Sequence, residues 1–178
     1  QWRFRLDGNH QSSDSISARR NASNKDADRD PYRNTGGGAS LSFLPAKGHE
    51  IGLSYRRNEG KTYYDSSTGT SSFDSRVLFE SEQWQVFTKN RILDNWNSKL
   101  HYGEAVDYQN NFYSGAPANG DYLRTQNKQL GWQNDVKLPL GSALISLERQ
   151  DQSVTPRTSF AADSEVTINS VVAGWMAN

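Results

Sequence analysis

Three aspartates spaced by two residues are the feature of this sequence best suited to chemistry: Asp26, Asp28 and Asp30. In an extended stretch this spacing points alternate carboxylates in the same direction. Hard cations such as Ca²⁺ take about six to eight oxygen ligands from carboxylates, carbonyls and water. The cluster therefore fits a calcium site. The neighbouring Lys25 and Arg29 also fit a solvated acidic loop, and the Gly and Glu positions of an EF-hand are missing.

The three histidines, His10, His49 and His101, offer little for catalysis. None of them stands in a nucleophile motif, and the sequence contains no Gly-x-Ser-x-Gly. His101 and Asp107 share a strand face, but the strand between them holds the two side chains about 20 Å apart. We therefore expect that the protein is not an enzyme.

Composition excludes several classes of partner. The chain of 178 residues carries 20 acidic and 20 basic residues, so no net field favours nucleic acid. Cysteine is absent, which excludes disulfides and thiolate metal sites. No apolar run approaches the ~18 residues that a membrane helix needs, and no signal peptide is visible.

Short and long connections alternate along the chain. Tight turns are predicted at residues 44–48, 93–96 and 139–142. Long polar connections are predicted at residues 12–31, 58–72, 109–122 and 151–164. An up-and-down barrel in an outer membrane has this arrangement, because its turns are short at one end and its external loops are long at the other.

Eight segments alternate apolar and polar residues with the period of a strand, and none shows a convincing helical period. They cover residues 2–6, 39–43, 51–55, 73–86, 100–108, 130–138, 143–147 and 166–175. The face of each segment opposite its apolar residues carries Arg, Lys, Asp, Gln and Gly. These residues suit a barrel with a wide, water-filled interior. The glycines at 36–38 are expected either to allow a close approach of strands or to bend the chain at the start of a strand. We expect an all-β fold, an antiparallel up-and-down transmembrane β-barrel segment of about eight strands from a larger barrel.

Two stretches together resemble a known family. Residues 28–35 read Asp-Arg-Asp-Pro-Tyr-Arg-Asn-Thr and lead into a strand of small and apolar residues. Residues 129–136 read Gln-Leu-Gly-Trp-Gln-Asn-Asp-Val and precede a short turn and the segment 145–150. Their order and spacing resemble the barrel of TonB-dependent outer-membrane receptors, most of all the vitamin B12 (cobalamin) transporter type.

This resemblance implies that residues 1–178 supply about eight early strands of a barrel of about 22 strands. The plug domain and signal peptide of a whole receptor would be absent, and the start at Gln1 within a strand pattern fits a segment of a longer protein. The implied function is import of cobalamin across the bacterial outer membrane with energy transmitted by TonB. The implied surroundings are outer-membrane lipid.

The resemblance also implies calcium ligands in the external loops. Asp28 and Asp30 match the family's pair by position, and Asp65 matches a further ligand. Asp14 is a weaker match, because the first loop is shorter in this chain.

The implied substrate surface lies in the external loops and the upper lumen. Amphipathic rings suited to a bulky, partly apolar ligand occur there at Tyr63, Tyr64, Phe112, Tyr113 and Tyr122. The same rings also suit loop packing or an aromatic girdle on the outside of the barrel.

Three alternatives remain at this point. A siderophore receptor of the same superfamily would share the barrel without necessarily sharing the calcium site. A complete small eight-stranded barrel, acting as an adhesin or structural protein, would need its first and last strands to pair. A soluble β-rich module, for example for glycans, would fold without detergent.

Overall fold

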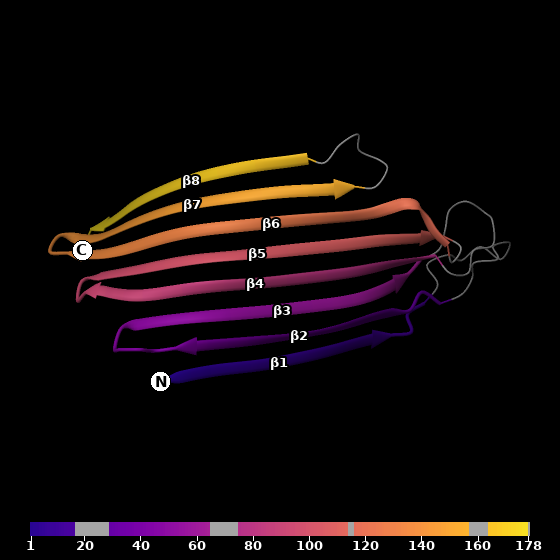
Figure 1. Cartoon of the computed structure of the whole chain (residues 1–178), viewed down its shortest axis with the longest axis horizontal. Coiled ribbons are helices and arrows are strands. Elements are labelled where there is room, and N and C mark those ends of the chain that lie inside the picture. The colour runs from indigo at the N-terminus through magenta and orange to yellow at the C-terminus, as the bar shows by residue number, and fades with distance from the viewer. Residues whose placement is uncertain (17–28, 65–74, 114–115, 157–163, 178) are drawn as a thin grey trace.

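The protein forms a single sheet of eight antiparallel strands that pair in sequence order from β1 to β8 (Figure 1). The computed structural model describes residues 1–16, 29–64, 75–113, 116–156 and 164–177. The strands are β1 (Trp2–Ser13), β2 (Tyr32–Phe43), β3 (His49–Tyr63), β4 (Arg76–Leu93), β5 (Trp96–Tyr113), β6 (Ala116–Leu138), β7 (Gly141–Pro156) and β8 (Ser164–Ala177). The predicted all-β, up-and-down architecture is confirmed. Within the described residues, no helix is long and apolar enough to cross a membrane.

Three tight turns lie at the end of the sheet where the two chain termini also lie (Figure 1). They join β2 to β3, β4 to β5 and β6 to β7, as predicted. Gly48 has φ of 85°, a left-handed conformation that favours glycine, and its carbonyl accepts a 2.7 Å hydrogen bond from the backbone N–H of Arg91. The Asn95 side chain donates to the Lys137 carbonyl at 2.9 Å. The first two turns are therefore tied to β4 and β6, respectively.

At the opposite end, the prediction of a long connection over residues 109–122 is wrong. β5 continues to Tyr113 and β6 begins at Ala116. The ladder between these strands persists with one register shift, between Asn110 and Phe112. Ladder hydrogen bonds join backbone groups, so a run of polar side chains does not end a strand.

The triple glycine also lies elsewhere than predicted. Residues 36–38 sit in the middle of β2, and Gly37 pairs directly with Gly8 on β1. Of the two expected roles, the bend at a strand's start is wrong, whereas close approach fits: a Cβ at Gly37 would lie 3.2 Å from the backbone oxygen of Asp7. A glycine has no side chain to mark a face, so the alternating pattern stops there although the backbone ladder continues.

The sheet is a single layer, which leaves both of its faces open. Among the described residues, no hydrophobic side chain is buried. Globular domains usually pack two layers of secondary structure around a shared hydrophobic core. The distribution of side chains over the two faces therefore decides what this sheet can contact.

Candidate functional site

One face of the sheet carries most of the large apolar side chains, and we call this group the apolar belt. Its members are Trp2, Phe4, Leu6, Leu41, Phe43, Ile51, Leu53, Val86, Leu100, Leu130, Trp132, Ile145, Leu147 and Val171. One row of direct cross-strand neighbours, from Trp2 on β1 to Val171 on β8, is apolar on every strand except at Thr88. Phe4 is 80% exposed and Leu53 is 47% exposed, so the belt is open surface.

The opposite face is polar over the same length of the strands. It carries Arg3, Arg5, Ser40, Ser42, Gly52, Ser54, Gln85, Lys99, His101, Gln133, Ser146 and Glu148. Ion pairs cross between its strands: Arg56 contacts Asp7 at 2.8 Å, and Lys89 contacts Glu50 at 3.5 Å. The predicted alternation is confirmed over most of β1 to β7. Exceptions on this polar face are Phe79 and Phe87 on β4 and Leu144 on β7, and β8 also places Ile168 there.

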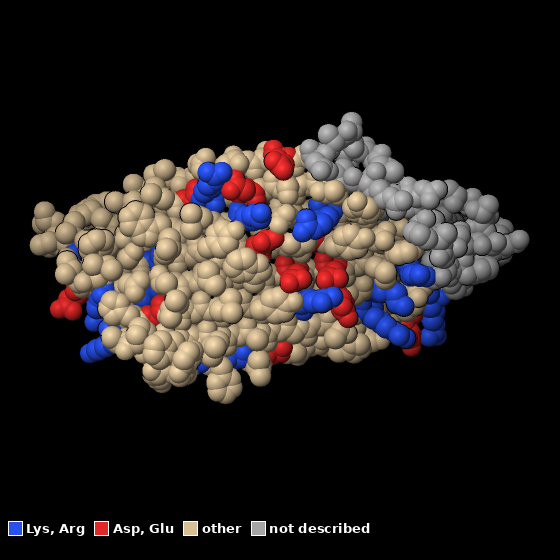
Figure 2. All heavy atoms as spheres, viewed as in Figure 1, with Lys and Arg blue, Asp and Glu red and all other residues tan. Residues whose placement is uncertain are grey.

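Charged side chains replace the apolar ones abruptly on the belt's face, on the side away from the tight turns. We call this row the charged collar: Arg57, Glu80, Glu82, Glu104, Lys128, Arg149 and Asp151. Figure 2 shows charged side chains gathered toward that half of the sheet. Arg57 contacts Glu80 at 3.0 Å, and Arg149 contacts Asp151 at 3.1 Å. The collar thus pairs opposite charges at two places, on β3–β4 and on β7.

Tryptophans anchor the belt on its turn side through their polar ends. The Trp96 indole N–H donates to Asn134 Oδ1 at 3.0 Å, and the Trp132 indole N–H donates to Ser98 Oγ at 3.0 Å. On the collar side, the rings of Trp84 and Tyr102 meet edge to face with centroids 5.5 Å apart. Aromatic rings thus lie toward both margins of the apolar belt.

The predicted calcium ligands are only partly within the described residues. Asp26, Asp28 and Asp65 lie outside them. Asp14 is exposed just after β1, and Asp30 is half-buried just before β2. In the described parts of the chain, no three His, Asp or Glu side chains gather closely enough to hold a metal ion. Calcium binding stays a prediction.

The predicted substrate rings fall mainly on the belt's face. Tyr63, Phe112 and Tyr122 share this face by register, beyond the collar. Each of these three rings has an identified neighbour, which is a cation for Tyr63 and Phe112 and another aromatic ring for Tyr122. The Lys61 ammonium lies 5.1 Å from the centre of the Tyr63 ring, the Arg76 guanidinium lies 4.9 Å from that of Phe112, and the centres of the Tyr108 and Tyr122 rings are 5.9 Å apart. The structure does not test their role in substrate binding.

The other two predicted substrate rings are less informative. Tyr64 follows β3, and its backbone N–H donates to the Ser75 carbonyl at 3.1 Å. Tyr113 ends β5, and its side chain lies outside the described part of the structure.

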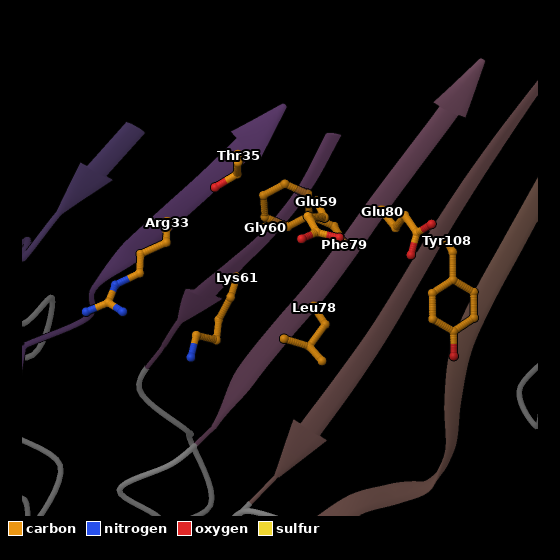
Figure 3. A pocket seen from close by; sticks show the side chains of 9 residues that line it. All are labelled: Arg33, Thr35, Glu59, Gly60, Lys61, Leu78, Phe79, Glu80 and Tyr108. Atoms are coloured by element: carbon orange, nitrogen blue, oxygen red, sulfur yellow. The ribbon is translucent and has the colours of Figure 1, made fainter. Parts of the chain in front are cut away.

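A groove of about 420 Å³ lies on the belt's face beyond the collar (Figure 3). Arg33 and Lys61 stand directly opposite each other in its wall, on β2 and β3. Within the described residues neither of them has an ion-pair partner. Sequence reasoning missed this pair because only the strand register brings the two cations together.

Comparisons with known proteins add no relative. No protein-family model matches the chain, and no curated protein is similar to it. Any statement about function therefore depends on the sheet's own geometry and on the sequence resemblance.

Trp96→Phe tests whether the belt's turn-side margin depends on an indole hydrogen bond. This variant should lower the free energy of unfolding by about 1–3 kcal/mol, because it leaves the amide oxygen of Asn134, a residue only 7% exposed, without its donor. Trp132→Phe is the matched control and should cost less, because Trp132 is 44% exposed and its partner Ser98 is only half-buried, so water can replace the lost donor. Denaturant unfolding of the two variants measures the difference, and equal losses would contradict this role for the buried amide.

Proposed function

We propose that this chain forms part of the wall of an outer-membrane β-barrel that binds and imports cobalamin as a TonB-dependent receptor. The observation that carries the proposal is the exposed apolar belt of a single-layer sheet, bounded by a charged collar. In membrane barrels, an outward apolar band lies between aromatic girdles, and the opposite face of each strand is polar.

Lipid is the covering that best fits the belt. Soluble monomers seldom expose apolar patches of more than a few hundred Å². Here large apolar side chains are open on all eight strands, and Phe4 and Leu6 are 80% and 75% exposed. The tryptophans and tyrosines at the belt's margins combine an apolar ring with a polar end, which suits the headgroup level of a bilayer.

A barrel of more than eight strands suits the sheet's edges. β1 and β8 are the outer strands of the sheet and do not pair with each other. In hydrocarbon every backbone group needs a partner, so open edges have to be closed by further strands. A complete eight-stranded barrel would require β1 to pair with β8. We therefore favour membership of a larger barrel over the small adhesin-like barrel.

The substrate rests on the sequence resemblance. In that family, external loops capture the ligand, and the plug moves when TonB transmits energy from the inner membrane. The long-connection end of the sheet would then face outside the cell, with Asp28, Asp30 and Asp65 in the loops that hold calcium. A siderophore receptor is the second candidate, because it would use the same wall with another loop chemistry.

Leu41→Arg and Ser42→Arg test the lipid-facing assignment with neighbouring residues of one strand. Arginine at Leu41 should cost about 2–4 kcal/mol near the bilayer midplane, whereas arginine at Ser42 would face the lumen and should be tolerated. Leu147→Arg and Ser146→Arg repeat the comparison on β7, and Leu53→Arg adds a third belt position. The yield of folded protein in isolated outer membranes gives the readout. Equal tolerance at belt and polar positions would refute the assignment.

Cyanocobalamin binding to the whole receptor in detergent, with calcium and then with chelator, tests substrate and metal together. The chelator, or Asp28→Ala with Asp30→Ala, should weaken binding by about 5- to 150-fold, the usual range of coupling between two sites. Asp135→Ala, near the tight turns, is the matched control and should have no effect. Absence of binding with and without calcium would move the proposal to the siderophore class.

A further inference from the structure

The groove beyond the collar contains an unusual pair of like charges. Arg33 and Lys61 are direct cross-strand neighbours, and like charges in that position destabilise a sheet. Figure 3 shows their side chains projecting the same way from neighbouring strands, with Leu78 and Tyr108 farther along the wall. Such a pair is an unfavourable arrangement unless an anion neutralises it.

The two carboxylates of the groove share one cation, Arg57, which balances one of their two negative charges. Glu59 and Glu80 also face each other across the ladder, but Arg57 contacts both, at 3.4 Å and 3.0 Å. In the described parts of the chain, Lys61 lies over the Tyr63 ring, and neither Lys61 nor Arg33 has an ion pair with a carboxylate. The free positive charge is therefore concentrated at the Arg33–Lys61 end.

A second hollow leads from the collar's margin to this cationic end. It has a volume of about 470 Å³, and Gly37 forms part of its floor. It shares Thr35 and Glu59 with the groove, and Tyr55 stands at its other end, beside the belt. The two cavities adjoin at Thr35 and Glu59 on the belt's face, and we call them together the glycine trough. The side chains of Thr35, Arg57 and Glu59 offer polar contacts to an extended chain lying along it.

We infer that the glycine trough holds the phosphorylated oligosaccharide of an outer-leaflet glycolipid, with Arg33 and Lys61 contacting a phosphate. This inference rests on the proposed outer-membrane location. The trough opens on the same face as the belt, so a lipid whose acyl chains cover the belt has its headgroup next to the trough.

Distance separates this ligand from an ordinary phospholipid. Lys61 lies six residues beyond Tyr55 on β3, which is about 20 Å along the strand. With a strand tilt of about 40°, this is about 15 Å along the membrane normal. The headgroup layer of a typical bilayer extends only about 5–7 Å beyond the hydrocarbon. A phospholipid phosphate therefore falls short of Lys61, whereas a phosphate on an extended oligosaccharide reaches it.

The direct test is titration of the whole protein in detergent with purified lipopolysaccharide that carries a phosphorylated core oligosaccharide, followed by native mass spectrometry. Arg33→Ala with Lys61→Ala should weaken binding about 30-fold, because each basic residue near an anionic lipid surface contributes about a factor of five. Arg3→Ala with Lys99→Ala removes the same charges from the polar face and should leave binding unchanged.

Further arms identify the source of the phosphate and the position of the chain. Dephosphorylated lipopolysaccharide and inorganic phosphate should bind weakly, and lipopolysaccharide truncated to its lipid anchor should be insensitive to the double variant. Thr35→Trp fills the part shared by the two cavities without changing charge and should also weaken binding. Equal binding by the double variant and wild type, or equal sensitivity with the truncated lipid, would overturn the inference.

Stability provides an independent check on folding. Removal of two opposed like charges should leave the unfolding midpoint of the double variant unchanged or raise it. A lower unfolding midpoint would contradict the claim that Arg33 and Lys61 repel each other without a neutralising partner. Failure of this inference is distinguishable from failure of the proposed function, because outer-membrane insertion and cyanocobalamin binding do not require the trough.

Discussion

The backbone ladder of one uninterrupted sheet is the constraint on which the rest of the structure depends. Each strand pairs with its sequence neighbours over most of its length, so side chains must alternate strictly between two open faces. With no second layer and no buried apolar side chain in the described residues, neither face is covered from within. The two faces therefore offer different chemistry to their surroundings, one apolar and one polar.

Because of the strand register, the side chains on the belt's face are arranged in layers along the strands. Along β3 the same face presents Ile51 and Leu53, then Tyr55, then Arg57, and finally Lys61. This order is apolar, aromatic, paired charge and unpaired charge, and neighbouring strands follow it in part. A bilayer has the same order of environments from its centre outward. The proposals of lipid insertion and of glycolipid binding thus both rest on this one pattern.

Alternation predicted the architecture and the facing of Leu41 and Ser146, because a period of two is written directly in the sequence. The same pattern led to wrong predictions at residues 36–38 and 109–122. There the strands continue through backbone hydrogen bonds, although the side chains show no apolar alternation. It could not predict the pairing of Arg33 with Lys61, since register depends on how each hairpin closes. The aspartates proposed for calcium mostly lie outside the described residues, so their arrangement stays a prediction.

Lipid accessibility of single side chains tests the central claim most directly. The chain has no cysteine, so spin labels can be attached one at a time to cysteines introduced at 40, 41 and 42 on β2 and at 145, 146 and 147 on β7. Labels at 41, 145 and 147 in the membrane-inserted protein should collide frequently with dissolved oxygen, whereas labels at 40, 42 and 146 should not. Uniform accessibility along either strand would contradict a lipid-facing belt.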